Sequence, residues 1–421
     1  MGRNPGGHMT RNGLVIGLLA LVLVACSGQP ASGGGGDTVG CRETLVADVT
    51  TSQTLTNGPE SCDYYIPSDG SDTTLEVRAD LTIQPGTVIR VGSNVRIRIG
   101  ASGSITALGS DSAPIVFEGE VAEQGYWYGL CFHDNLESRL DHVEILWAGN
   151  LWTGSHVCNG AISGVSAPGG EPVHVTNSLI RGSRTSGLSA FGVNLGEFSN
   201  NVLADHRLYG ARVSTSNLNA LGSGDYLGNT IAGAENGRPY IHVSGTLSAS
   251  GADHTWRDVG APYFVTTDDA SYGGNIIITD GATVSIEPGV TFVMDARTSV
   301  SVEQGASLQA VGTEAAPITF RGASNTPGHW NGIRFRGSAG STIEHTEIAW
   351  AGGSAGDPDT GSVYIYRPGG TGAITFTFVV IRGTSACGIF ATSSGEQGVE
   401  INGVRVEEPY SGRPDLCGPF E

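Results

Sequence analysis

Short runs in which hydrophobic and polar residues alternate recur along most of the chain. Val95-Arg96-Ile97-Arg98-Ile99 alternates strictly, and further short strands are expected at 87–91, 104–108, 115–118 and 140–146. Such alternation is typical of half-buried β-strands. Gly, Asn, Ser, Asp and Pro separate the runs and favour turns. No amphipathic helix of three turns is evident beyond the N-terminal segment, so the pattern predicts an all-β fold.

A long internal repeat organises these strands. Residues 81–150 align without gaps to 284–353 at a constant offset of 203, with 22 identities in 70 positions. Two segments show it well: ALGSDSAPIVFEG (107–119) matches AVGTEAAPITFRG (310–322), and LDHVEILWAG (140–149) matches IEHTEIAWAG (343–352). The repeat predicts two tandem modules, 41–240 and 241–421, as in solenoid proteins.

A shorter period lies inside each module. Gly187 and Gly210 are 23 residues apart, and Gly388 and Gly412 are 24 apart. A coil of this length, with three short strands, suits a parallel β-helix in which inward Ile, Val, Leu and Phe stack between coils. Whether the two modules form one rod or two abutting rods is left open by the sequence.

The repeated motifs resemble the right-handed parallel β-helix proteins of the pectin-lyase-like superfamily. The shared pattern is an I-x-P-G turn, (G/A)-x-(I/L)-x-A-x-G, A-P-I-x-F and W-x-G-(I/L)-x-F, over 81–149 and 284–352. It also resembles repeat modules of exported bacterial lipoproteins and adhesin-like proteins. The resemblance implies a β-helix rod. It leaves activity open, since this superfamily includes lyases, hydrolases, adhesins and scaffolds, and fold alone does not determine function.

The N-terminus has the organisation of an export signal. Arg3 and Arg11 precede an apolar run from Leu14 to Ala25, which is short for a membrane span but suits residues 1–25 as a signal peptide. Leu23-Val24-Ala25-Cys26 resembles a bacterial lipobox, which predicts lipid attachment at Cys26; an ordinary signal peptide with an incidental Cys is the alternative. Residues 26–40 read as a flexible Gly/Ser tether. Translation starting at Met9 would leave a more typical signal.

These features predict an exported protein anchored in the cell envelope through its lipid. By resemblance to Gram-negative lipoproteins, Ser27 after the Cys favours the outer membrane, on either its periplasmic or its cell-surface side.

The composition excludes several classes of protein. The chain has 65 Gly, which is roughly twice the usual share, without the three-residue period of collagen. All 22 basic residues are Arg, against 41 acids, for a net charge of -19 that would become −21 after removal of residues 1–25. This charge argues against nucleic acid as a partner. It also disfavours a lyase acting on polyuronates, unless Ca²⁺ bridges the charges.

Six further Cys are predicted to form disulfides, since an even number in an exported chain suggests them. Fifteen pairings are allowed, and we favour neighbours: Cys41–Cys62, Cys131–Cys158 and Cys387–Cys417. Free thiols are the alternative. The first and last pairs would lie at the two ends of the rod and act as caps.

Candidate residues for acid–base or metal chemistry are few. Asp357-Pro-Asp359-Thr-Gly361 begins like a calcium loop, but no later acid completes it; Asp268-Asp269 and Asp69/Asp72 are weaker candidates. His142/Glu144 recur as His345/Glu347 and, as i, i+2 pairs on a strand, should share a face. Arg181 and its equivalent Arg382 are the candidates for a lyase base. We interpret these as surface residues of a repeat and predict no catalytic residue, metal or cofactor, with Ca²⁺ the weak exception.

Aromatic residues are the better signal for ligand binding. Tyr126, Tyr128 and Trp152 in the first module, and Tyr364 and Tyr366 in the second, are the candidates for stacking on sugar rings, whereas Trp127 and Trp330 belong to the fold pattern. The sequence therefore predicts a non-catalytic, membrane-anchored rod that binds glycans or surface partners. A polysaccharide lyase or glycoside hydrolase is the first alternative, and a purely structural envelope component the second.

Overall fold

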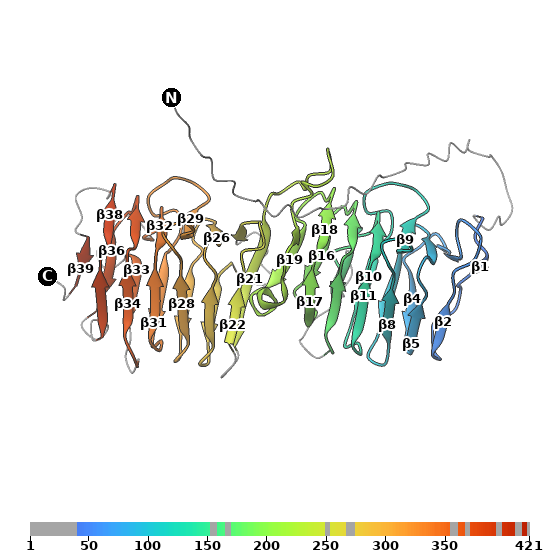
Figure 1. Ribbon diagram of the computed structural model, residues 1–421, viewed down its shortest axis with the longest axis horizontal. Coiled ribbons are helices and arrows are strands. Elements are labelled where there is room, and N and C mark those ends of the chain that lie inside the picture. Colours follow the sequence, from blue (N-terminus) through green and yellow to red (C-terminus); the bar gives the residue numbers. More distant parts are fainter. Residues whose placement is uncertain are drawn as a thin grey trace, which may run out of the picture. The chain divides into compact units, whose positions relative to one another are not determined.

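The computed structural model describes residues 40–151, 158–164, 170–248, 253–266, 274–353, 361–366, 371–392, 398–408 and 415–418. These residues form an all-β structure in which every pair of adjacent strands is parallel and comes from successive coils (Figure 1). The described residues also include a short 3₁₀-helix, η1 (Thr215–Ala220). No helix in the described residues is long and apolar enough to span a membrane. The predicted right-handed parallel β-helix is confirmed.

The N-terminal half has three sheets, each contributing one strand per coil. Sheet 1 contains β1 (Glu43–Thr44), β3 (Tyr64–Ile66), β6 (Val88–Val91), β9 (Ile115–Gly119), β12 (Val143–Leu146), β15 (Leu179–Arg181), β18 (Asn201–Ala204) and β20 (Gly224–Asp225). Sheet 2 contains β4 (Thr73–Val77), β7 (Val95–Ile99), β10 (Gly129–Phe132), β13 (Ile162–Gly164), β16 (Leu188–Ala190), β19 (Ala211–Ser214) and β21 (Ile241–Ser248). Sheet 3 contains β2 (Gln53–Leu55), β5 (Asp80–Ile83), β8 (Ser104–Leu108), β11 (Ser138–Asp141), β14 (Val173–Thr176) and β17 (Leu195–Ser199).

The C-terminal half repeats this arrangement. Sheet 4 contains β23 (Tyr263–Val265), β26 (Thr291–Met294), β29 (Ile318–Gly322), β32 (Thr346–Ala349), β35 (Val380–Arg382) and β38 (Arg405–Glu407). Sheet 5 contains β24 (Ile276–Thr279), β27 (Val300–Glu303), β30 (Ile333–Arg336), β33 (Gly361–Tyr366), β36 (Cys387–Ala391) and β39 (Leu416–Cys417). Sheet 6 contains β22 (Asp253–Trp256), β25 (Thr283–Ile286), β28 (Ser307–Val311), β31 (Ser341–Glu344), β34 (Ile374–Thr377) and β37 (Val399–Asn402).

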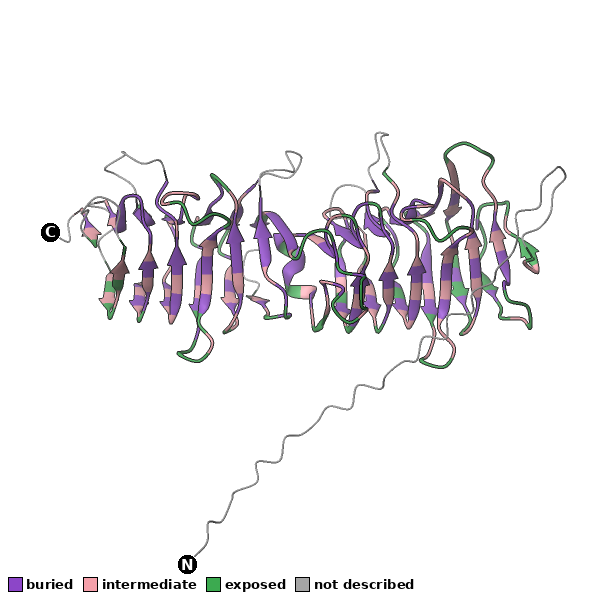
Figure 2. Ribbon diagram, turned by 90° about the horizontal axis from the view of Figure 1, so that it is seen from above, coloured by how far each residue is buried: buried purple, intermediate pink, exposed green. Residues whose placement is uncertain are grey.

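Inward residues of successive coils stack into one continuous core. Figure 2 shows buried and partly buried positions alternating along the strands, as the sequence pattern predicts. In sheet 4, Tyr263, Phe292 and Phe320 lie in register, and the rings of Phe292 and Phe320 are parallel at 5.0 Å. One cluster of buried apolar side chains runs from Val49 to Ala391. The low hydrophobic content of the chain is therefore sufficient, because a stacked coil needs apolar residues only at inward positions.

Strand positions in the two halves keep the offset seen in the sequence. β6, β8, β9, β11 and β12 have counterparts β26, β28, β29, β31 and β32 whose first and last residues all lie 203 positions later. Trp127 and Trp330 are fully buried, and their Nε1–H groups donate to the carbonyls of Leu146 and Ala349, each at 2.9 Å. Their predicted role in packing is confirmed.

One predicted strand, 140–146, is divided by a corner. His142 has a φ of 50° and separates β11 from β12, and His345 does the same between β31 and β32 with a φ of 42°. The expectation that His142 and Glu144 share one strand face is therefore wrong. A left-handed residue turns the chain from one sheet to the next, and alternation alone does not reveal such a corner.

The two halves are joined through β21, which pairs with strands of sheets 2, 4 and 5. In its first part, His242 and Val243 pair with both β19 and β23, whereas Gly245 to Ser248 pairs with β24. Gly245, with a φ of 114°, lies where the strand passes from one pairing to the other. Sheet 2 thus continues into sheet 4, and Thr38–Glu421 forms one compact unit.

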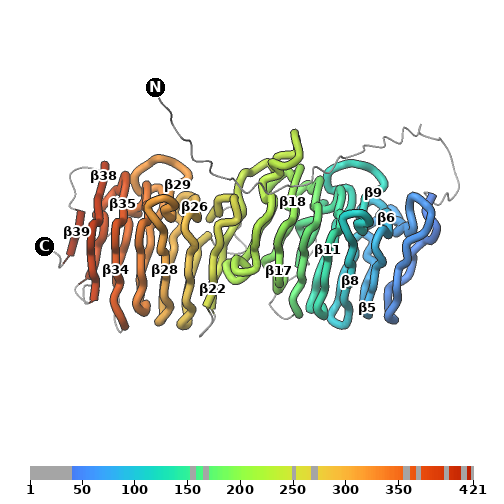
Figure 3. Tube along the Cα trace, viewed as in Figure 1, coloured from blue at the N-terminus to red at the C-terminus, as the bar shows by residue number. Residues whose placement is uncertain are grey.

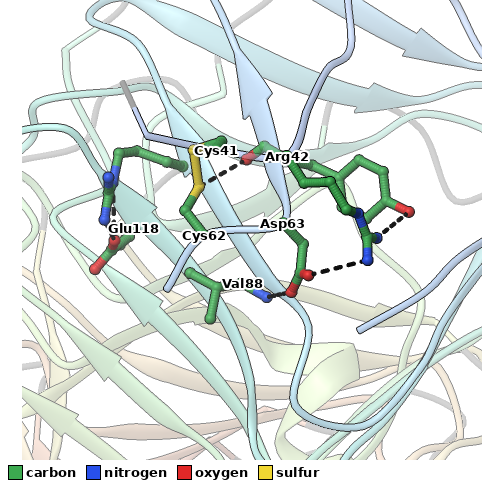
Figure 4. Close-up of a disulfide and its surroundings, with 8 residues drawn as sticks. Cys41, Arg42, Cys62, Asp63, Val88 and Glu118 are labelled. Carbon is green, nitrogen blue, oxygen red and sulfur yellow. Dashed lines mark hydrogen bonds and ion pairs between the residues drawn. A yellow bond between two sulfur atoms is a disulfide. The ribbon is translucent and has the colours of Figure 1, made fainter. Parts of the chain in front are cut away.

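All three predicted disulfides are present: Cys41–Cys62, Cys131–Cys158 and Cys387–Cys417. The first joins the N-terminal coil to the next one (Figure 4). Beside it, the buried Asp63 carboxylate accepts hydrogen bonds from the backbone N–H groups of Gly58 and Val88 and lies 3.6 Å from Arg42. A buried charge needs such partners, and here they hold the end of the stack together.

Candidate functional site

Two of the aromatic residues predicted to bind ligands lie on the outer face of sheet 5. β33 alternates so that Val363 and Ile365 enter the core while Tyr364 and Tyr366 point outward. The register places Tyr364 between Arg334 and Phe390, and Tyr366 beside Arg336. We call Arg334, Arg336, Tyr364, Tyr366 and Phe390 the aromatic strip. β33 and β36 lie near the C-terminal end of the stack (Figure 1).

The aromatic strip is flat and open. The Tyr364 and Phe390 rings are parallel within 6° at a centroid distance of 5.7 Å, and Tyr366 is 44% exposed. A shallow depression of about 510 Å³ lies over it, lined by Gln304, Arg336, Gly337, Tyr364 and Tyr366. Because these side chains come from neighbouring paired strands, their spacing is set by the sheet and needs little ordering when a ligand binds.

The two arginines give the aromatic strip a local positive charge on an acidic protein. Among the described residues neither Arg334 nor Arg336 has an ion-pair partner within 4.0 Å, although Glu303 is the register neighbour of Arg336. Burial lowers the pKa of the Arg334 guanidinium, and Arg336 lowers it further. The guanidinium N–H groups of these two arginines can donate hydrogen bonds to a polar ligand on the strip.

The N-terminal half closes the equivalent face. Arg334, Tyr364 and Phe390 correspond to Cys131, Ser163 and Ser189, which are also in register across β10, β13 and β16. Cys131 and Ser163 are at most 1% exposed, and Cys131 forms a disulfide with Cys158. The fold therefore does not require an open aromatic face here, and the strip is a specific feature of the C-terminal half.

Tyr126 and Tyr128 are placed differently, in the connection from β9 to β10. Tyr128 is only 7% exposed and its hydroxyl donates to Asp72 at 2.6 Å; burial and this hydrogen bond raise its pKa to about 12. The Tyr126 hydroxyl donates to Glu120 at 3.0 Å. The structure does not bring either ring to an open face with Tyr364 and Tyr366. Trp152, the remaining aromatic candidate, and Cys26, the predicted lipid attachment site, lie outside the described residues.

The candidates for acid–base chemistry are engaged in local contacts. The His142 imidazole lies between Asp141 and Asp111, at 3.1 and 3.2 Å, whereas His345 stacks on Phe378. Arg382 lies between Glu347 and Glu407, at 3.2 and 3.0 Å.

Of the candidate metal ligands, Asp69 and Asp72 lie within the described residues. Asp69 accepts hydrogen bonds from Ser71 and Thr73, and these lower its pKa to about 2. The other acids proposed for Ca²⁺ binding, at 357, 359, 268 and 269, lie outside the described residues. Within the part of the chain that is described, no group of three or more His, Cys, Asp or Glu side chains is placed to hold a metal ion.

Sequence reasoning missed the partners of the two tyrosines. The signal was present as two Arg at alternating positions, 334 and 336, one coil before two Tyr at alternating positions, 364 and 366. Only the register between the strands shows that the two Arg lie beside the two Tyr. A shift of one residue in that register would turn either the Arg pair or the Tyr pair toward the core.

Residues 265–369 match a family model described as a pectate-lyase like beta helix domain. This match spans β24 to β33 and therefore includes most of the aromatic strip. Comparison with curated proteins and with solved structures produced no match.

Proposed function

Because the chain is a right-handed parallel β-helix of the pectin-lyase-like type, a fold that by itself specifies no activity, we propose that it is a non-catalytic carbohydrate-binding protein. The ligand contacts the aromatic strip, and an acylated Cys26 holds the rod at the cell envelope. The observation that carries this proposal is the open, flat surface formed by Tyr364, Tyr366 and Phe390 on one sheet.

Aromatic rings and guanidinium groups together suit a saccharide. A sugar ring presents C–H groups on its faces, which pack on flat aromatic rings, and hydroxyl groups at its edge, which accept hydrogen bonds from Arg. Tyr supplies a large contact area with few rotatable bonds, so binding costs little side-chain entropy. A strip along neighbouring coils also fits an extended chain better than a compact ligand.

The anchor follows from the N-terminal sequence rather than from the described structure. Cys26 after a short apolar run is the expected acylation site, and residues 26–40 would tether the rod. Several acyl chains hold a protein on a membrane firmly, whereas a single chain is marginal. Intact-mass measurement of the membrane fraction tests this, since acylation shows as an added mass that Cys26→Ser removes.

A polysaccharide lyase or glycoside hydrolase, and a purely structural envelope component, remain the alternative hypotheses. No specific observation in the described residues favours either over saccharide binding.

The test uses the full chain on a glycan array followed by titration calorimetry with each saccharide retained. Tyr366→Ala should weaken affinity by about tenfold, as expected for loss of an aromatic contact worth roughly 1.4 kcal/mol. Phe378→Ala is the matched control, because Phe378 is a similarly exposed ring (53%) at the corner between sheets 6 and 4. Unchanged affinity in Tyr366→Ala, or no retained saccharide, would contradict the proposal.

A further inference from the structure

A second hollow lies on the outer face of sheet 3, in the N-terminal half. It has a volume of about 380 Å³ and is lined mainly by polar side chains of β11, β14 and β17. Strands of this sheet are visible side by side in Figure 3. We call it the sheet 3 groove and define it by Arg139, Asp141, His174, Thr176, Glu197 and Ser199. It belongs to a different sheet and a different half of the chain from the aromatic strip.

The strand register builds this groove. Arg139 pairs with His174, and Asp141 pairs with Thr176, which in turn pairs with Ser199. Leu140, Val175 and Phe198 point inward and are at most 1% exposed. Polar groups therefore alternate with core residues, so that three successive coils present hydrogen-bonding side chains on one surface.

His174 is held in one orientation by an irregularity of β17. The register between β14 and β17 shifts after Val173, and Gly196 lies under the imidazole: a Cβ there would be 2.6 Å from His174 Cε1. The backbone N–H of Glu197 donates to His174 Nδ1 at 3.0 Å. In the neutral imidazole Nε2 therefore carries the proton, and it lies 3.5 Å from a Glu137 oxygen.

Asp141 supplies an acceptor at the other side of the groove. Thr176 and Asn177 donate to one carboxylate oxygen at 2.7 and 2.8 Å, and His142 contacts the other. Burial raises the pKa of this carboxyl, but these hydrogen bonds outweigh it and the pKa is lowered. Asp141 is thus ionised and oriented before any ligand binds.

The fold itself does not require these residues. Arg139 and His174 correspond to Thr342 and Thr375 in the C-terminal half, which pair with each other in the same way. The coil with threonine at both positions keeps the same pairing but lacks the guanidinium and imidazole groups. A cluster that differs between equivalent coils, while the core beneath it is retained, is a candidate for function rather than folding.

Local charge selects the class of ligand. Arg139 is paired with Glu137, so Asp141 and Glu197 leave the groove negative. A carboxylated or sulfated sugar would be repelled, whereas the hydroxyls of a neutral sugar match the mixture of acceptors and donors. Leu108, 46% exposed at the margin, offers an apolar contact for a ring face.

We propose that the sheet 3 groove is a second saccharide-binding site, specific for neutral sugars, which gives each chain two sites of different chemistry. The inference rests on the proposed function, since it assumes that the rod binds glycans.

The test is titration calorimetry of the full chain with cellotetraose, maltotetraose and tetragalacturonate. His174→Ala in the Tyr366→Ala background should weaken the binding of at least one neutral tetrasaccharide by about tenfold. Thr375→Ala, at the equivalent position, is the matched control and should have no effect. Tetragalacturonate binding should not respond to His174→Ala.

The outcomes separate the two proposals. If neutral tetrasaccharides bind and His174→Ala changes neither their affinity nor their stoichiometry, the groove proposal is wrong, and the aromatic strip stands where Tyr366→Ala weakens the binding. If His174→Ala weakens binding but Tyr366→Ala does not, the strip is wrong and the groove stands. Absence of neutral tetrasaccharide binding to the wild-type chain overturns the groove. Equal urea midpoints for the variants confirm that any loss is local, and Gly196→Ala, which crowds the imidazole, should reproduce it.

Discussion

At the scale of single residues, corners of the coil show most clearly what the fold requires. Asn177 and Asn200 adopt φ values of 50° and 57° between sheets 3 and 1, a conformation that Asn tolerates well. The corresponding corner between sheets 6 and 4 holds Phe378 with a φ of 54°. Its ring is 53% exposed, and its contacts with His345 and Gly403 bury little surface. A bulky residue here is a source of backbone strain.

Phe378→Asn should therefore stabilise the protein. Left-handed backbone costs an ordinary residue roughly 1–2 kcal/mol, so removing the strain should raise the unfolding free energy by about 1 kcal/mol. Urea unfolding followed by circular dichroism measures the change. The reciprocal variant Asn177→Phe is the control and should destabilise by at least as much, since it also loses the hydrogen bond to Asp141. A Phe378→Asn variant less stable than wild type would show that the stack on His345 outweighs the strain.

At the scale of elements, disulfides strengthen the coils that have the fewest neighbours. Most strands within the stack pair on both sides, whereas among the described strands β1 pairs with β3 alone and β39 with β36 alone. Cys41–Cys62 and Cys387–Cys417 lie in these terminal coils, with sequence separations of 21 and 30. In Figure 4, the disulfide, Asp63 and Arg42 are gathered at one such coil. Cross-links placed there oppose fraying where the sheet edges are unpaired.

Removing the C-terminal disulfide should loosen that end alone. Cys387→Ser/Cys417→Ser removes a cross-link worth about 3 kcal/mol in the chain-entropy model, and contacts in a stacked coil are mostly between neighbours. We expect faster amide exchange in β36, β38 and β39, with β24 to β27 unchanged, as measured by hydrogen–deuterium exchange. The Cys131→Ser/Cys158→Ser variant is the internal comparison. If exchange at the C-terminal end is the same in both variants, the predicted cap has no role.

At the scale of the whole molecule, the two halves share one core. Val243 of β21 is fully buried and is in register with Val213 of β19 and Val265 of β23. It therefore contributes to the stack on both sides of the junction. The sequence left open whether the modules form one rod or two, and this pairing favours a single cooperative unit.

Val243→Ala should destabilise strands of both halves. The substitution removes buried methyl groups and leaves a cavity, at a cost of about 1–3 kcal/mol. Hydrogen–deuterium exchange should accelerate in β19 and in β23 alike. Val175→Ala, at an equally buried site inside the N-terminal half, should affect only coils of that half. Protection of β23 and β26 that does not change in Val243→Ala would instead indicate two independent rods.

Much of the fold was predictable because its determinants are local and repeated. Alternation located β7 and β8 with their observed bounds, and neighbouring Cys in sequence proved to be neighbours in space because successive coils stack directly. The corner at His142 was missed, because a polar residue between two strand-like runs does not by itself determine a left-handed φ. The sheet 3 groove was missed for another reason: Arg139, His174 and Glu197 are distant in sequence and meet only through register.

The sequence by itself determined the coil and the residue types that fill its core. Period-two alternation and turn residues act over a few positions, and both recur at the 203-residue offset. The tertiary structure alone decided which outward residues share a face. Tyr364 and Tyr366 join Arg334 and Arg336 on an open sheet, whereas Cys131 and Ser163 are covered at the equivalent place. The reason is physical: inward positions are selected by burial, which any alternating strand satisfies, but outward neighbours depend on the register between coils and on what covers them.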